Sequence, residues 1–125
     1  MIAFVTGATG FVGREVVKTL YARGIEVRCL IRTTGKERIL QDYPVEVHYG
    51  SIQDPAALRA AFYNIDVVVH LVAVIKENGN ATFEAINKSG TENLVEVAQS
   101  EGTSHFIHQS ALGAADDPRF PYLRS

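Results

Sequence analysis

Five short apolar runs are distributed along the chain, and each has the length and composition of a buried β-strand. They span residues 2–6, 25–31, 45–49, 66–74 and 104–110. The first, IAFVT, and the fourth, DVVVHLVAV, are apolar at nearly every position, which is typical of strands buried on both faces of a sheet. Because the fourth run is the most apolar, we expect it near the centre of that sheet.

Segments with helical spacing separate these runs. Helices are predicted at residues 11–23, 55–63 and 83–101, with a weak helix at 36–41. The helix at 55–63 has the strongest start signal, because Asp54 is a good N-cap and Pro55 fits the first helical turn. Gly24 and Gly102 follow the first and last of these helices and predict their ends. The tail 111–125 has turn chemistry and no clear element.

Strands that alternate with helices predict one α/β domain over residues 1–125, in which helices cover both faces of a parallel sheet. Right-handed crossovers favour the strand order 3-2-1-4-5, the doubly wound arrangement of a three-layer Rossmann fold. A parallel sheet that ends at its fifth strand leaves an unpaired edge. We therefore expect this edge to be open to an oligomer or a larger complex.

Three glycines are spaced three residues apart where the first strand meets the first helix, in TGATGFVG. Gly7 permits a tight exit from the strand, Gly10 lets the backbone approach a bulky anion, and Gly13 lets the helix pack closely on the sheet. The amides near Phe11 and Val12 would then face a pyrophosphate at the positive end of the helix dipole. This context predicts a dinucleotide site, and a purely structural glycine turn is the alternative.

The residues after the second strand indicate which dinucleotide is bound. NAD sites usually have an acidic residue there for the ribose hydroxyls, whereas NADP sites have arginine near the 2′-phosphate. In this chain Arg32 follows the strand, Lys36 is close to it, and the first acidic residue is Glu37. The pattern favours NADP, with NAD as the alternative cofactor and a solvated basic turn as the plainer interpretation.

Composition excludes several other classes of function. The chain of 125 residues is 46% hydrophobic and 21% charged with a net charge of −2, so it has no basic excess for nucleic acid. No apolar run approaches the roughly 20 residues of a membrane helix, and we expect a cytoplasmic protein. Cys29 is predicted to be a buried hydrophobe without a disulfide. His70, His105 and His108 lie within strands as buried, hydrogen-bonded side chains, and we expect no metal site.

These motifs together resemble the short-chain dehydrogenase/reductase superfamily, in its extended or atypical branch. The resembling segments are TGATGFVG, VVVHLVAV, AINKSGTENLVEVA, FIHQSALGA and a terminal PYLRS, which span nearly the whole chain. The last two are most similar to the atypical subgroup that contains the nucleotide-binding accessory subunit of respiratory complex I, with NmrA-like NADP sensors as neighbours. The resemblance implies a Rossmann fold and hydride transfer between a nicotinamide and a carbonyl or hydroxyl substrate.

The resemblance also assigns residues to the parts of the cofactor. The pyrophosphate loop matches Gly7, Thr9, Gly10, Phe11, Val12 and Gly13. The adenine would lie on Ser51 and Ile52, where serine replaces the usual aspartate of the family. The segment under the cofactor ribose matches Leu71, Val72 and Ala73.

Three further polar residues match the catalytic region of the family. Asn87 corresponds to the helix asparagine that fixes the active-site backbone, Ser110 to the serine that binds a substrate carbonyl, and Tyr122 to the tyrosine of the Tyr-x-x-x-Lys motif. Each also has a plainer interpretation from the residues alone. Asn87 would satisfy a loop carbonyl, Ser110 would cap a turn, and Tyr122 would be an ordinary amphipathic surface residue.

The lysine of the tyrosine motif would occupy position 126, directly after Ser125. In the family this lysine lowers the pKa of the tyrosine. A phenol with an ordinary pKa of about 10 is only ~0.1% ionised at pH 7, and forming the phenolate costs about 4 kcal/mol, roughly a thousandfold in rate. We therefore expect the cofactor half of a longer protein, lacking the C-terminal substrate-binding part, which binds nucleotide without turnover.

Two other classes of function remain open at this stage. The first is a non-catalytic module, either an NADP(H)-binding redox sensor or a structural nucleotide-binding subunit. The second is an interaction protein that uses the fold only as a scaffold. The glycine loop and Arg32 argue against a pure scaffold, because neither is needed for one.

Overall fold

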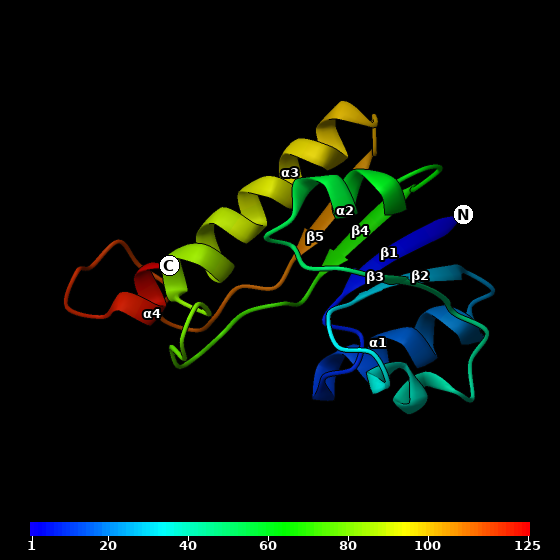
Figure 1. The fold of residues 1–125 in the computed structure, drawn as a ribbon, viewed down its shortest axis with the longest axis horizontal. Helices are drawn as coiled ribbons and strands as arrows, with labels where there is room; N and C mark the ends of the chain where they lie inside the picture. Colours follow the sequence, from blue (N-terminus) through cyan, green and yellow to red (C-terminus); the bar gives the residue numbers. More distant parts are fainter.

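A five-stranded parallel sheet forms the centre of the computed structural model, which describes all residues 1–125 (Figure 1). Its strands are β1 (Ile2–Thr6), β2 (Glu26–Ile31), β3 (Glu46–Tyr49), β4 (Val67–His70) and β5 (His105–His108). Neighbouring strands are parallel in the order β3-β2-β1-β4-β5, with β3 and β5 at the edges. The predicted doubly wound Rossmann arrangement and its strand order are confirmed.

Helices cover both faces of this sheet, as predicted (Figure 1). The helical elements are α1 (Phe11–Ala22), the 3₁₀ segment η1 (Lys36–Leu40), α2 (Pro55–Ala61), the π-type segment η2 (Phe83–Gly90), α3 (Thr91–Ser100) and the short α4 (Pro121–Arg124). The Asp54 side chain accepts hydrogen bonds from the Ala56 and Ala57 amides at 3.0 and 3.3 Å, which makes it the expected N-cap of α2.

Successive side chains of the central strands alternate between two cores. Phe4 and Val68 pack with α2, η2 and α3 on one face, whereas Val5 and Val69 pack with α1 and η1 on the other. Both faces are therefore apolar, which explains the continuous apolar runs in the sequence. Cys29 is buried in the second core without a disulfide, as predicted, and burial raises the pKa of its thiol to about 12.

Two strand predictions were wrong at the carboxyl end of the sheet. The strand predicted at 66–74 ends at His70, and beyond it the backbone of Val74 pairs with the side chain of Asn87 instead of a neighbouring strand. The strand predicted at 104–110 ends at His108, opposite the end of its partner β4. The segments that follow β4 and β5 thus leave the sheet at the same level.

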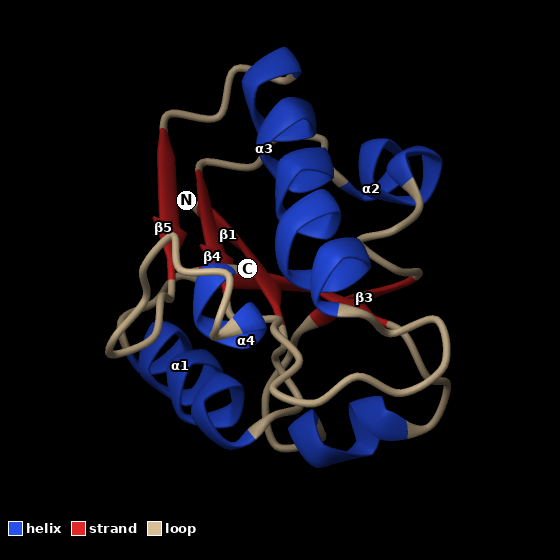
Figure 2. Cartoon of the chain, turned by 90° about the vertical axis from the view of Figure 1, so that its left-hand side faces the viewer, coloured by secondary structure: helices blue, strands red, loops and turns tan.

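The helical predictions also needed correction. The helix predicted at 83–101 begins with the wider π-type turns of η2 before α3 continues it. The tail, predicted without an element, ends in α4, where Pro121 occupies the first turn and the Ser125 amide donates to its carbonyl at 3.0 Å. Figure 2 shows α4 beyond the carboxyl ends of β4 and β5. Tyr122 therefore lies on a helical turn and not in a loop.

Candidate functional site

The glycine turn after β1 packs directly against the start of α1. Gly7 has a φ of +73°, and a Cβ added there would stand 3.1 Å from the Leu71 carbonyl carbon. A Cβ on Gly13 would stand 2.8 Å from the Ala8 Cα and would overlap the Gly7 carbonyl oxygen. Gly10 is the N-cap of α1 and has no side chain to cap the first amides. These amides are therefore available to a ligand at the positive end of the helix.

A cavity of about 230 Å³ lies beside this turn, and we call it the glycine-side cavity. The predicted residues that line it are Gly7, Thr9, Arg32, Ser51, Ile52, Val72 and Ala73. They come from the turn after β1, the ends of β2 and β3, and the segment after β4. The structure thus gathers residues from four separate parts of the sequence at one end of the sheet.

The adenine candidates Ser51 and Ile52 are held by local and distant contacts. The Ser51 hydroxyl accepts a hydrogen bond from the Gln53 amide at 3.1 Å, so it stabilises its own turn. The Asn93 side chain of α3 donates to the Ile52 carbonyl at 2.9 Å. Gly90 leaves the space that the buried Ile52 side chain occupies, since a Cβ there would stand 2.6 Å from it.

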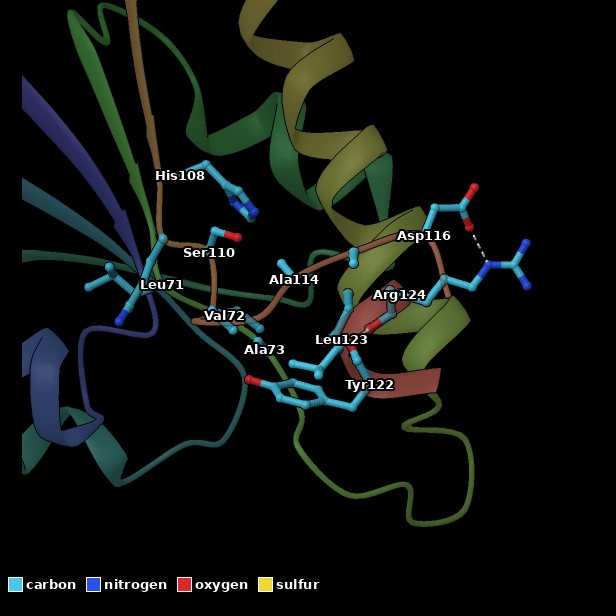
Figure 3. A pocket seen from close by; sticks show the side chains of 15 residues that line it. Leu71, Val72, Ala73, His108, Ser110, Ala114, Asp116, Tyr122, Leu123 and Arg124 are labelled. Carbon is cyan, nitrogen blue, oxygen red and sulfur yellow. Dashed lines mark hydrogen bonds and ion pairs between the residues drawn. The ribbon is translucent and has the colours of Figure 1, made fainter. Parts of the chain in front are cut away.

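A second cavity of about 460 Å³ opens beside α4, and we call it the tyrosine-side cavity (Figure 3). Its predicted residues are Leu71, Val72, Ala73, Asn87, Ser110 and Tyr122. Val72 and Ala73 line both cavities, so the two hollows adjoin along this segment. The pair of cavities follows the carboxyl ends of the strands, where doubly wound sheets bind their ligands.

Asn87 fixes the segment that lines both cavities. Its Oδ1 accepts a hydrogen bond from the Val74 amide at 2.8 Å, and its Nδ2 donates to the Val74 carbonyl at 3.0 Å. The same Nδ2 also donates to the Ser125 hydroxyl at 2.9 Å. Asn87 therefore satisfies the hydrogen-bonding groups of the loop backbone. It thereby orders the segment 71–74, which forms the floor of the cleft made by the two cavities.

Ser110 and Tyr122 line the same cavity but do not point at each other. In Figure 3 the Tyr122 ring extends from α4 toward the strand ends, whereas the Ser110 hydroxyl points in a different direction. The Tyr122 ring also contacts the Phe83 ring, with the centroids 6.0 Å apart.

Five predicted residues lie outside the walls of both cavities: Gly10, Phe11, Val12, Gly13 and Lys36. Gly13 is buried against the turn, while the Phe11 side chain is 83% exposed at the start of α1. Lys36 begins η1 as an exposed side chain. Beside it, the Glu37 carboxylate accepts a hydrogen bond from the Gly35 amide at 2.7 Å and so stabilises the basic turn.

The sequence prediction missed a buried polar chain under the cleft. Thr6 and His70 end the adjacent strands β1 and β4, and their side chains are hydrogen-bonded at 2.6 Å. The other ring nitrogen of His70 is 2.9 Å from the Thr91 hydroxyl. The polar residues at the last positions of two neighbouring apolar strands could have indicated the contact between Thr6 and His70. The contact to Thr91 spans 21 residues and depends on the fold.

The three histidines that the sequence analysis named differ in environment. His70 is buried and hydrogen-bonded, as expected, and burial, with a smaller effect of His108, lowers its pKa to about 4. His105 and His108 are exposed on the edge strand, so their predicted burial was wrong. No group of three or more His, Cys, Asp or Glu side chains is placed to hold a metal ion. No helix has both the length and the apolar character needed to cross a bilayer.

A doubly wound sheet with a glycine turn at its switch point and adjoining cavities above it defines a dinucleotide-binding domain. A profile of the family described as NAD(P)H-binding matches residues 7–124. The chain belongs to this NAD(P)H-binding family.

The proteins similar to this chain include oxidoreductases and proteins with other functions. The photosystem II assembly factor Ycf39 of Synechocystis is 30% identical over 98% of this chain and 37% of its own length. A ceramide reductase of Caulobacter vibrioides is 32% identical over 99% of this chain and 39% of its own length. A short-chain dehydrogenase/reductase superfamily protein of Agrobacterium tumefaciens, solved with bound NAD, superposes with a TM-score of 0.79. That match has 27% identity and covers 98% of this chain and 41% of the other. The chain thus spans about two fifths of the length of these proteins.

Proposed function

We propose that this domain binds NADP(H) across the two adjoining cavities, as the cofactor part of an oxidoreductase. The observation that carries the proposal is that Val72 and Ala73 line both cavities. A dinucleotide needs one extended cleft with a phosphate site between its two ends. The adenosine half belongs in the glycine-side cavity, and the nicotinamide half in the tyrosine-side cavity.

The pyrophosphate belongs at the start of α1. Gly7, Thr9 and Gly10 supply a turn that a bulky anion can approach, and the amides near Phe11 and Val12 supply donors. The adenine then lies against Ser51 and Ile52, and the ribose of the nicotinamide half lies over Leu71, Val72 and Ala73. Gly13 acts indirectly, because it lets α1 approach the turn.

The preference for NADP over NAD rests on the basic turn after β2. Arg32 lines the glycine-side cavity, and exposed Lys36 begins η1 in the same turn. The nearest acidic residue in this turn, Glu37, accepts a hydrogen bond from the Gly35 amide. Its carboxylate therefore has a structural partner, and we assign Arg32 to the 2′-phosphate, with Lys36 nearby in the same turn.

In the whole protein, Tyr122 and Ser110 would serve the chemistry at the nicotinamide end. The bound cofactor supplies or accepts a hydride. The Tyr122 phenol would give its proton to the substrate carbonyl oxygen, and the Ser110 hydroxyl would donate a hydrogen bond to that oxygen. Asn87 would keep the adjoining backbone in place through its two bonds to Val74.

A non-catalytic role is the second candidate, and the site geometry gives a reason to test it. The Ser110 and Tyr122 hydroxyls point in different directions. Among the similar proteins is one described as an assembly factor. In the whole protein, Tyr122→Phe should abolish carbonyl reduction without changing NADPH affinity if the role is enzymatic. Absence of any reductase activity, with tight NADPH binding retained, would instead support the non-catalytic role.

Calorimetric titration with NADPH and NADH tests the cofactor assignment. A charge-assisted bond to a phosphate contributes about 1.5–3 kcal/mol, so Arg32→Ala should weaken NADPH binding by about 10- to 150-fold. NADH binding should change less than about threefold, because NADH lacks the 2′-phosphate. Arg38→Ala, which removes an exposed arginine of η1, is the matched control and should leave both affinities unchanged. Equal losses for NADPH and NADH in Arg32→Ala would refute the assignment.

A further inference from the structure

We propose that His70 is a positioning residue for the cleft, an inference that rests on the proposed cofactor site. Held as one neutral tautomer, His70 joins the ends of β1 and β4 to the helix that carries Asn87. By doing so it fixes the segment from Leu71 to Val74, on which the cofactor would lie. His70 itself contacts neither cavity, since it is only 1% exposed and is absent from both walls.

The direction of the hydrogen bonds assigns the tautomer. A carbonyl oxygen only accepts, so the Thr91 hydroxyl, 2.8 Å from the Asn87 carbonyl, must donate to it. The Thr91 oxygen can then only accept from His70, 2.9 Å away, which places the ring proton on Nε2. The Nδ1 atom is left as an acceptor, and the Thr6 hydroxyl donates to it at 2.6 Å.

The series of hydrogen bonds through His70 continues to the floor of the cleft. The Thr6 oxygen, having donated its proton to His70, accepts a hydrogen bond from the Leu71 amide at 3.2 Å. At the other end of the segment, the Val74 backbone is held by the Asn87 side chain. Both ends of the floor are therefore tied to Asn87, one through its side chain and the other through its carbonyl.

The surroundings of His70 fit a neutral ring. The ring packs beside the Phe106 ring and is stacked on the exposed His108 at a centroid distance of 5.4 Å. His108 is the titratable group of β5 that stacks on His70, and no ion pair joins His70 to a carboxylate. A cationic ring would donate from both nitrogens, so Thr6 would lose the acceptor that orients its hydroxyl.

Nitrogen NMR of the histidine rings tests the tautomer without any cofactor. At pH 7 the His70 ring should be neutral, with its proton on Nε2 and a non-protonated Nδ1. A proton on Nδ1, or a charged ring, would overturn the proposal. This result does not depend on whether NADPH is the ligand, so it is separate from the proposed function.

Substitution of Thr91 tests the positioning role. Thr91→Val keeps the shape and removes the hydroxyl, so NADPH affinity should fall by at least about fivefold, the equivalent of about 1 kcal/mol. Thr91→Ser restores the hydroxyl and should return the affinity to within about twofold of the unaltered protein. Rescue by serine distinguishes the hydrogen-bond chain from simple packing.

Thr103→Val is the matched control at the far end of the sheet. Its hydroxyl also donates to a backbone carbonyl, that of Ile65, at 3.3 Å. It should lower stability without changing NADPH affinity by more than about twofold, since it does not reach the cleft. Unchanged affinity in Thr91→Val, or an equal loss in Thr103→Val, would overturn the positioning role. Failure of the unaltered protein to bind NADPH would instead refute the proposed function, while the tautomer measurement would still stand.

Discussion

Replacing Gly13 with alanine offers a sharp test of how α1 and the glycine turn form the cleft. The new Cβ would stand 2.8 Å from the Ala8 Cα and the Gly7 carbonyl carbon, and would overlap the Gly7 carbonyl oxygen. Ordinary non-bonded contacts begin near 3.5 Å, and the overlap with the Gly7 carbonyl oxygen is the largest, so α1 or the turn must move by roughly 1 Å or more. The obstructing atoms are backbone, and a side-chain rotation cannot relieve the clash.

Two opposing effects set the change in stability. Overpacking of this kind costs about 1–3 kcal/mol. Alanine in place of glycine within a helix returns about 1 kcal/mol through helix propensity. The free energy of unfolding should therefore fall by about 2 kcal/mol, the upper end of this difference, because all the obstructing atoms are backbone, and the domain should remain folded. NADPH affinity should fall as well, because the displaced amides near Phe11 no longer converge on the pyrophosphate.

Denaturant unfolding and calorimetric titration of the same Gly13→Ala sample separate these effects. Losing one charge-assisted hydrogen bond to phosphate costs about 1.5–3 kcal/mol, so the dissociation constant for NADPH should rise at least about tenfold. Lys18→Ala, at an exposed position of α1, is the control and should leave the affinity unchanged. Affinity of Gly13→Ala within twofold of the unaltered protein would refute the reasoning.

Three further predictions concern stability and the cleft. The pKa of His70 is lowered from 6.5 to about 4, so between these pH values the unfolded chain binds more protons than the folded one. The free energy of unfolding should therefore fall by up to about 3 kcal/mol as the pH drops from 6.5 to 4. Urea unfolding at a series of pH values measures this change, and a free energy of unfolding that does not vary with pH would contradict it. The pKa of Glu46 is also lowered, first by its hydrogen bond with His48, and protonation of Glu46 should reduce stability further only below about pH 4.5. Asp54→Ala removes the cap of α2 and should cost about 1 kcal/mol in the same assay, whereas no change would show that the cap is dispensable. Asn87→Leu removes both side-chain hydrogen bonds to Val74 and should weaken NADPH binding, measured by calorimetry, by at least about fivefold. Unchanged binding would show that the floor of the cleft keeps its conformation without Asn87.

Much of the fold followed from local patterns in the sequence. The alternation of apolar strands and amphipathic helices gave the topology, because each element buries one or two faces in a way that its own residues record. The cap at Asp54 and the stop at Gly24 are likewise local, and the structure has both α2 and α1 where these signals placed them. Gly7 and Arg32 were predicted from the glycine spacing and the basic turn, and the other predicted cavity residues from the resemblance. The fold brings these residues to one end of the sheet.

The errors arose where distant contacts override a local pattern. Residues 71–74 are as apolar as a strand, but the backbone of Val74 pairs with the side chain of Asn87, which only the folded helix brings near. The link from His70 to Thr91 could not be predicted for the same reason. The helix at Pro121 is a single turn, too short to leave a periodic signal in the sequence.

A crystal structure of the chain grown with NADP⁺ tests the central claim most directly. The account predicts the pyrophosphate within hydrogen-bond distance of the amides near Phe11 and Val12, the 2′-phosphate beside Arg32, and the nicotinamide in the tyrosine-side cavity. Electron density for NADP⁺ elsewhere on the molecule, or an empty cleft at saturating cofactor, would contradict it.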